Sequence, residues 1–77
     1  MIFTQDRKAI TSTDNLNYIE VEEKELNYIY TITAYYADSK RLLGQYKTAN
    51  RANEILEDMY KQIMTQNFSF TYKMPKE

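Results

Sequence analysis

The hydrophobic pattern of this 77-residue chain changes its period once, near residue 47, and this change limits the possible folds most. Before it, apolar and polar residues alternate, which is typical of strands that bury one face. From Thr48 onward, apolar residues recur every three or four positions, as in an amphipathic helix. The pattern predicts an α+β fold, with an antiparallel β-meander of four to five strands over residues 1–47 packed on one C-terminal amphipathic helix over residues 48–66.

The first strands of the meander are expected close to the N-terminus. Residues 1–4 and 9–11 have strand patterns on either side of a polar break and are expected to pair as a hairpin. Further along, Ile19 and Val21 alternate with glutamates, so these two apolar side chains should share one face. A charged turn is expected at residues 23–25. Loops this short favour hairpins over parallel crossovers, so the pairing is expected to be antiparallel throughout.

The longest strand is expected over residues 27–37, because this segment is rich in tyrosine and β-branched residues. A turn at residues 38–40 and a last strand over residues 41–47 should complete the meander. The face assigned to the core contains Tyr30, Ile32, Ala34 and Tyr36.

One helix is expected after this sheet. Thr48 is the expected N-cap, because its hydroxyl can accept a backbone N–H that has no helical partner. The helix should end near residues 65–67. Its apolar stripe consists of Ala52, Ile55, Leu56, Met59 and Ile63.

The tail, residues 67–77, returns to a period of two, with Phe68, Phe70 and Tyr72 on one face. It is expected to form an extra strand at a sheet edge, because Pro75 has no N–H to donate. Two arrangements remain open: the tail returns to its own sheet, or it pairs with an edge of another copy and forms a homodimer.

Composition excludes several classes of function. A chain of this length forms a single domain. It contains no Cys and no His, which removes the usual zinc ligands, the Ser-His and Cys-His nucleophile pairs, and disulfides. Its one glycine excludes a glycine-rich phosphate loop. Glu54, Glu57 and Asp58 lie opposite the apolar stripe and are expected to be solvated. We therefore expect no enzymatic activity, no metal and no cofactor.

The same composition bears on localisation. No apolar run approaches the roughly 20 residues that a membrane-spanning helix needs. The first residues include an acid and no long apolar stretch, unlike a signal peptide. Because cysteine is absent as well, a cytoplasmic protein without membrane association is expected.

One stretch resembles a known group of proteins. Leu42-Leu43-Gly44-Gln45-Tyr46-Lys47-Thr48, followed by Ala52 and Ile55-Leu56, is similar to small uncharacterised proteins of Firmicutes and of their phages and integrative elements. In that group a Leu-Gly-x-Tyr-x-Thr strand precedes a C-terminal helix. Arg51 departs from the pattern, because acidic residues are usual in the first helical turn. The resemblance implies the fold and an origin in phages or mobile elements, and no activity.

A basic segment between residues 40 and 51 is the first candidate site. Lys40, Arg41, Lys47 and Arg51 lie in a window without acids. Such a segment could contact phosphate or an acidic partner, although an ordinary solvated surface is favoured. Arg51 stands out, because a cation at a helix N-terminus opposes the helix dipole.

The second candidate site is the tyrosine surplus, eight residues in all. Tyrosines on the sheet face away from the helix could stack nucleobases or anchor a protein, whereas packing across neighbouring strands needs no partner and is favoured. The net charge of −1 favours a protein over nucleic acid.

The function expected from the sequence is a non-catalytic protein-binding module of phage or mobile-element origin, which associates with itself or inhibits a host protein. The alternative is a weak nucleic-acid-binding accessory protein that uses residues 40–51. The side chains expected to contact a partner are Tyr28, Tyr35, Lys40, Arg41, Lys47, Arg51, Phe68, Phe70 and Tyr72.

Overall fold

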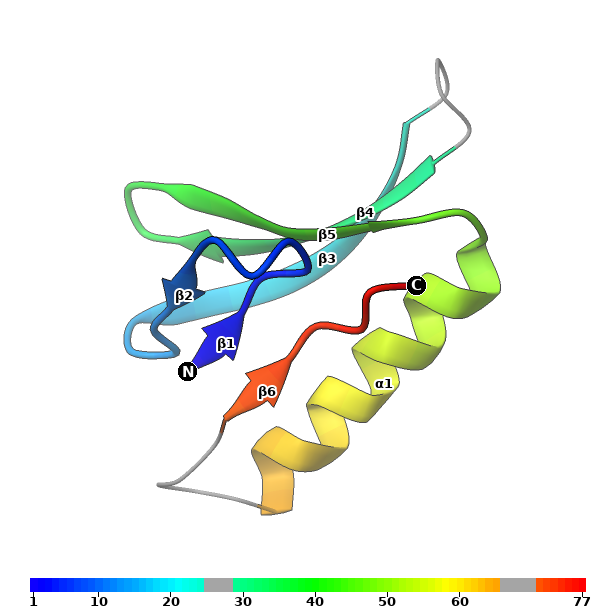
Figure 1. Ribbon diagram of the computed structural model, residues 1–77. Helices are drawn as coiled ribbons and strands as arrows, with labels where there is room; N and C mark the ends of the chain where they lie inside the picture. The colour runs from blue at the N-terminus through cyan, green and yellow to red at the C-terminus, as the bar shows by residue number, and fades with distance from the viewer. Residues whose placement is uncertain (25–28, 66–70) are drawn as a thin grey trace.

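A meander, a helix and a second small sheet make up the computed structural model, which describes residues 1–24, 29–65 and 71–77 (Figure 1). The described strands form two three-stranded sheets, in the orders β3-β4-β5 and β2-β1-β6. The α+β class and a meander packed on one helix are therefore confirmed. The meander has three strands instead of the expected four to five, because β1 and β2 belong to the second sheet with β6. The elements are β1 (Ile2–Phe3), β2 (Ile10–Thr11), β3 (Leu16–Lys24), β4 (Ile29–Tyr36), β5 (Lys40–Tyr46), α1 (Ala49–Thr65) and β6 (Tyr72–Lys73).

The inner face of the meander carries the core, as the alternation predicts. Ile32 and Ala34 of β4 are fully buried, and Ile19 and Val21 of β3 pack beside them. The strands pair antiparallel, with Ile19 opposite Ala34. Several boundaries were wrong. β4 ends at Tyr36 instead of residue 37, and β5 spans Lys40–Tyr46, so Lys40 is part of the strand and not of the turn expected at residues 38–40. The charged turn expected at residues 23–25 does not start at residue 23, because β3 continues to Lys24.

Gly44 marks an irregularity in β5. The register shifts where Ile32 faces Gly44 and Thr33 faces Leu42, so Leu43 is the extra residue of a bulge. The bulge sends Leu43 into the core and leaves Leu42 on the outer face. A Cβ at Gly44 would lie 2.8 Å from the Tyr46 hydroxyl oxygen, so only glycine lets this ring fold back over the strand.

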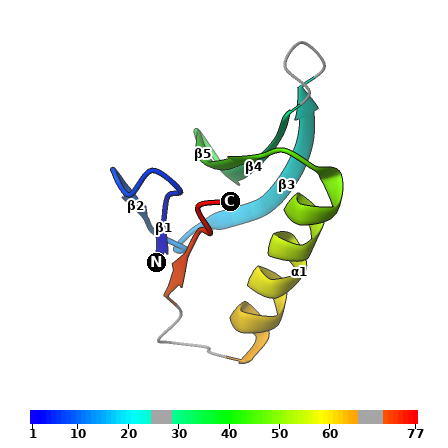
Figure 2. The same cartoon turned by 45° about the vertical axis from the view of Figure 1, so that its right-hand side comes forward.

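Helix α1 begins as predicted. The backbone N–H of Arg51 donates to Oγ1 of Thr48 at 3.1 Å, which confirms the N-cap. The helix lies against the inner face of the meander (Figure 2). Its residues Ala52, Ile55 and Met59 are buried. Its apolar stripe is the reason for this placement, because those side chains leave water only against the sheet.

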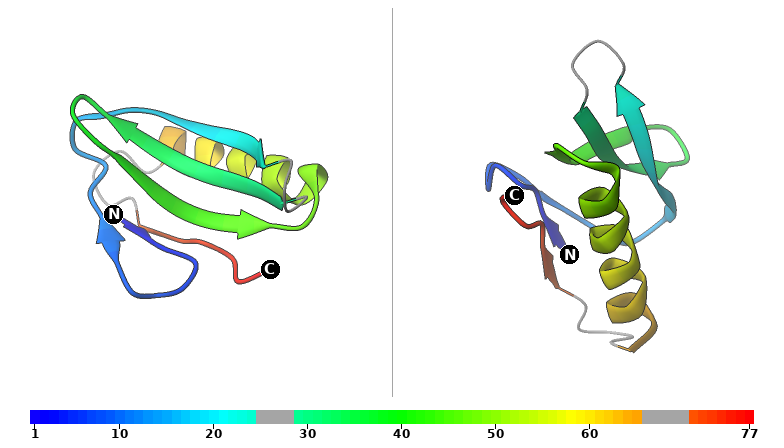
Figure 3. Two further views of the ribbon diagram at one scale, coloured as in Figure 1. Left: turned by 90° about the horizontal axis from the view of Figure 1, so that it is seen from above. Right: turned by 90° about the vertical axis from the view of Figure 1, so that its right-hand side faces the viewer.

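The small sheet joins the two ends of the chain. Strands β1 and β2 form the predicted antiparallel hairpin, and β6 pairs with β1 as an edge strand. This second pairing is parallel, so the expectation of antiparallel pairing throughout was wrong. Short loops prevent parallel pairing only between strands that follow each other directly. β1 and β6 are the first and last strands, and the long stretch of chain between them allows the parallel pairing. Figure 3 shows the small sheet beside the meander.

Tyr36 connects the two sheets. Its hydroxyl donates to the carbonyl oxygen of Ser12 at 2.7 Å and lies 2.8 Å from Oγ1 of Thr11 in β2.

No helix among the described residues is long and apolar enough to cross a membrane.

Candidate interaction surface

The outer face of the meander, away from α1, carries a tyrosine pair. Tyr18 of β3 and Tyr35 of β4 stack with ring centroids 4.6 Å apart and planes 16° from parallel. This is the cross-strand packing that the sequence favoured over an exposed binding ring. Tyr35 is therefore occupied within the fold, whereas Tyr28 lies outside the described residues.

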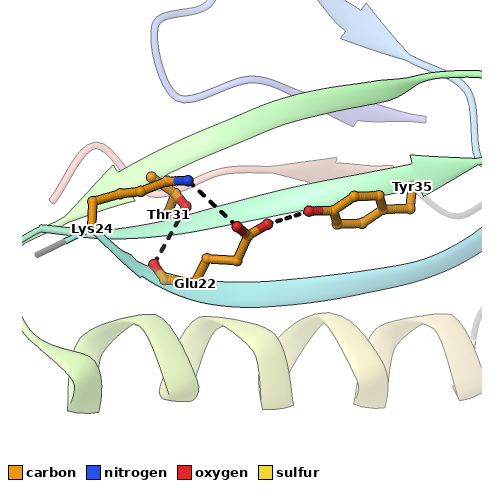
Figure 4. A network of polar contacts seen from close by, with 4 residues as sticks. All are labelled: Glu22, Lys24, Thr31 and Tyr35. Carbon is orange, nitrogen blue, oxygen red and sulfur yellow. Dashed lines mark hydrogen bonds and ion pairs between the residues drawn. The ribbon is translucent and has the colours of Figure 1, made fainter.

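A polar network extends from this pair along β3 (Figure 4). The Tyr35 hydroxyl donates to the Glu22 carboxylate, which also accepts a hydrogen bond from Lys24 Nζ at 3.4 Å. The Tyr35 bond, with help from Lys24, lowers the pKa of Glu22 below its usual range, and the same bond raises the pKa of Tyr35 to about 12. The network holds Glu22 ionised and fixes the tyrosine pair.

The structure separates the predicted basic segment into two groups. Lys40 and Arg41 begin β5, whereas Lys47 and Arg51 follow its other end, about 20 Å away at the usual rise of a strand. Lys8, which the sequence analysis did not select, joins Lys40 and Arg41 along a polar groove of about 590 Å³. The four predicted cations therefore do not form one patch.

Arg51 has a role within the fold. Its Nε donates to the main-chain oxygen of Glu77 at 2.8 Å, and its guanidinium lies 3.9 Å from the Glu54 carboxylate. The tail contact offsets the unfavourable position of a cation at the helix N-terminus.

The tail over residues 71–77 is held in place by side chains from three other parts of the chain. Four consecutive main-chain oxygens, those of residues 74–77, each accept a hydrogen bond from a different side chain. The donors lie in the loop between β1 and β2, at the end of β5 and in the first turn of α1. The bonds run from Arg7 Nη1 to Met74 (2.8 Å), Tyr46 Oη to Pro75 (2.6 Å), Gln5 Nε2 to Lys76 (2.8 Å) and Arg51 Nε to Glu77 (2.8 Å).

Two apolar anchors fix the same tail. Met74 is fully buried and Tyr72 is 5% exposed. The Tyr72 hydroxyl donates to Asp58 Oδ2 at 2.9 Å, and burial together with this bond raises the pKa of Tyr72. Listing Tyr72 among the partner contacts was therefore wrong, because its ring fills the core. Phe68 and Phe70 lie outside the described residues. Of the two arrangements left open by the sequence, the structure shows the intramolecular return of residues 71–77.

The two edges of the meander differ. At the β5 edge, the Gln5 backbone N–H donates to the Leu43 carbonyl at 2.8 Å, and the Gln5 side chain bonds both the N–H and the C=O of Gln45. At the β3 edge, the described part of the chain supplies no further strand. Apart from the ladder with β4, the β3 main chain bonds only Thr31 Oγ1 of β4, at the Glu22 carbonyl (3.4 Å), and the Thr13 carbonyl, through the Leu16 N–H (3.3 Å), among these residues. An edge strand without a partner leaves every second residue with free backbone N–H and C=O groups. The open edge is therefore β3.

An apolar groove of about 510 Å³ runs beside the open edge, between the first half of β3 and the second half of α1. Tyr60 and Ile63 of α1 are exposed to 65% and 37% there. Glu57 lies at its rim, and Glu20, Glu22 and Glu23 continue along β3. The groove is lined by Leu16, Asn17, Tyr18, Ile19, Leu56, Glu57, Met59, Tyr60 and Ile63.

The helix carboxylates do not converge into a site. Glu57 faces the groove, and Asp58 accepts hydrogen bonds from Tyr72 and from Gln62 at 3.3 Å. Within residues 1–24, 29–65 and 71–77, no three Asp or Glu side chains are placed to hold a metal ion.

Sequence reasoning missed the groove, although one signal was present. Tyr60 widens the apolar stripe of α1, and Ile63, a member of the predicted stripe, stays 37% exposed. β3 is the strand where the sheet ends. The order of strands was needed to bring these features together.

Comparison with protein-family models, with curated proteins and with solved structures finds no match to this chain.

Proposed function

We propose that this protein is a cytoplasmic, non-catalytic module that binds another protein at the open β3 edge and the groove beside it. The groove carries the proposal: large apolar side chains stay exposed on a small domain, next to unpaired strand hydrogen-bonding groups. Contiguous apolar surface of this kind is typical of interaction sites. An origin in phages or mobile elements rests on the Leu-Gly-x-Tyr-x-Thr resemblance, and the cytoplasmic location rests on the absence of cysteine.

Nucleic acid is the weaker alternative. The cations proposed for it lie at opposite ends of β5, and Arg51 bonds the tail. Of the two described tyrosines that were expected to contact a partner, Tyr35 stacks on Tyr18 and Tyr72 is buried. These contacts leave Lys8, Lys40 and Arg41 as the basic group, which is small for a phosphate backbone.

The test compares matched variants on one helix. Proteins captured from a cell lysate, with and without nuclease, are identified, purified and titrated against wild type, Tyr60→Lys and Asn53→Lys. Tyr60 is in the groove, whereas Asn53 is exposed and outside it. We expect Tyr60→Lys to weaken binding at least about tenfold, as for a central interface residue, and Asn53→Lys to leave it unchanged.

Two results would contradict the proposal. One is a purified protein partner that binds wild type and Tyr60→Lys equally. The other is recovery of nucleic acid alone, sensitive to nuclease and lost in Lys40→Glu. Lys40 is preferred over Arg51 for this variant, because Arg51 also holds the tail.

A further inference from the structure

We infer that the open edge takes a specific kind of occupant: an extended segment of a partner protein, in which apolar and basic residues alternate, added to β3 as a fourth strand. This inference rests on the proposed function and names the chemistry of the partner.

The strand order leaves the backbone of β3 unpaired on one side. β3 is nine residues long and pairs on one side only, with β4. A strand added on its other side would gain main-chain hydrogen bonds whatever its sequence, which is how β-strand addition obtains affinity. The β5 edge offers no such place, because Gln5 already bonds Leu43 and Gln45.

The two faces of an added strand would meet different surroundings. On the inner face, side chains would lie over the groove, against Leu56, Tyr60 and Ile63 of α1. On the outer face, they would continue the row that holds Glu20 and Glu22. Since side chains of a strand alternate between faces, the occupant needs apolar residues at every second position and a different residue type between them.

Charge decides that residue type. Glu20 is exposed and has no hydrogen-bond or ion-pair partner among the described residues, and Glu22 is held ionised by Tyr35. Glu23 lies on the inner face, where its carboxylate accepts a hydrogen bond from the Tyr30 hydroxyl, and Glu57 lines the groove, so the outer row depends on Glu20 and Glu22. Opposite charges across a strand pair are stabilising and like charges are destabilising, so lysine or arginine fits the positions facing Glu20 and Glu22.

The same charges disfavour a second copy in part of its possible registers. In a symmetric antiparallel β3–β3 pair centred on Glu20 or Val21, acid faces acid: Glu20 meets its own equivalent or Glu22 of the other copy. A pair centred on Ile19 avoids these contacts, so the titration below also tests for a dimer.

The probe is a capped eight-residue peptide of alternating valine and lysine. It is titrated against the protein by NMR, and amide hydrogen exchange is measured along β3, with β5 as the internal reference. Three comparison peptides are used: alternating valine and glutamate, a scrambled valine–lysine sequence, and the first peptide N-methylated at two neighbouring central residues. N-methylation at neighbouring residues removes a donor from each edge of the peptide and leaves the protein unchanged.

We expect the valine–lysine peptide to bind and to slow exchange in β3 but not in β5, and the N-methylated peptide to fail. The valine–glutamate peptide should bind at least about fivefold more weakly, since charge pairs on one face change from attractive to repulsive. Glu20→Lys should reverse this preference. Glu54→Lys makes the same charge change on an exposed helix position outside the groove and should leave the preference unchanged.

Several results would overturn the inference. They are equal binding of the N-methylated or scrambled peptide, no binding of the valine–lysine peptide, or a concentration-dependent dimer that protects β3. No binding would mean that the glutamates only keep the edge from pairing. The proposed function is judged separately. If a purified partner binds Tyr60→Lys more weakly than wild type but binds Glu20→Lys as tightly, the proposed function stands and the inference is wrong.

Discussion

The two edges of the meander lie on one small sheet, yet the chain covers one and leaves the other open. At β5, Gln5 bonds the strand, and the adjoining tail is fixed by four side-chain donors and two buried anchors. At β3, the described residues provide glutamates and an apolar groove in place of a covering segment.

This difference separates stability from recognition. The covered side contains fully buried side chains and hydrogen bonds between residues far apart in sequence, such as Arg7 with Met74. Substitutions there should unfold the domain. The open side contains half-exposed side chains, whose loss removes little buried area. Substitutions there should spare the fold and change binding.

Met74→Ala should have the largest effect, because Met74 is fully buried where the tail meets the core. We expect a loss of about 2–5 kcal/mol in the free energy of unfolding, measured by urea denaturation. Ile63→Ala, on the open side and 37% exposed, is the matched control and should cost less than about 1 kcal/mol. Equal losses in the two variants would remove the distinction between the two sides.

Gly44→Ala should come next, at about 1–3 kcal/mol, because the new methyl group would overlap the Tyr46 ring. The ring has little room to move, since it is 2% exposed and its hydroxyl bonds Pro75. Gln45→Ala, at the neighbouring exposed position, should stay within about 0.5 kcal/mol of wild type. If Gly44→Ala were as stable as wild type, the Tyr46 ring could move aside at little cost. The covered side would then tolerate substitution as the open side does.

Tyr46→Phe should lower stability by about 1–2 kcal/mol at neutral pH, because it removes the hydrogen bond to the Pro75 carbonyl. It should also change the response to alkali. Burial raises the pKa of Tyr46 from 10.0 to about 12, so the folded state keeps a proton that the unfolded state loses. The contribution is complete below pH 10 and is lost as pH rises toward 12.

Urea titrations at several pH values between 9 and 12 measure this effect. Wild-type stability should fall more steeply above pH 10 than that of Tyr46→Phe, and tyrosinate absorbance should show one late-titrating group fewer in the variant. Parallel pH profiles would contradict the buried position of the Tyr46 hydroxyl.

The sequence predicted the parts of this fold that depend on local pattern. Alternation placed Ile32 and Ala34 in the core, and Thr48 was recognised as the N-cap because its signal lies within four residues. The covered edge was missed, because Gln5 and Gln45 are 40 residues apart and neither carries a local signal for the other. Arg51 was selected for the wrong reason: its position is unusual for a helix alone, and its partner is the tail.

The candidate site was predictable only in part, for a related reason. Exposed apolar residues on α1 and acids on β3 are each visible in the sequence, but a groove requires knowing that β3 is the edge strand nearest the exposed part of the helix. Strand order is a property of the whole chain. The tyrosines show the same limit, since alternation places Tyr35 on the outer face without revealing that Tyr18 covers it.

The smallest expected effect belongs to the open side, at Glu22. The Tyr35 hydroxyl, with Lys24, lowers the pKa of Glu22 from its usual 4.5, so the folded state stabilises the carboxylate. This contribution is present above pH 4.5 and is lost as pH falls through the lowered value. Urea denaturation between pH 2 and 7 should therefore show a shallower acid dependence for Glu22→Gln than for wild type.

Tyr35→Phe makes this last prediction specific, because it removes the donor and keeps the ring that stacks on Tyr18. Its acid dependence should lie between those of wild type and Glu22→Gln, because Glu22 keeps its contact with Lys24. The double variant should match Glu22→Gln, since neither has a titrating group at residue 22. At neutral pH each should remain closer to wild type than Tyr46→Phe, because the bond lies at a solvated surface where screening weakens it. A loss in the free energy of unfolding as large as that of Tyr46→Phe would mean that the outer face of β3 stabilises the fold as much as the covered side does. The two edges would then differ only in how their backbone hydrogen-bonding groups are covered.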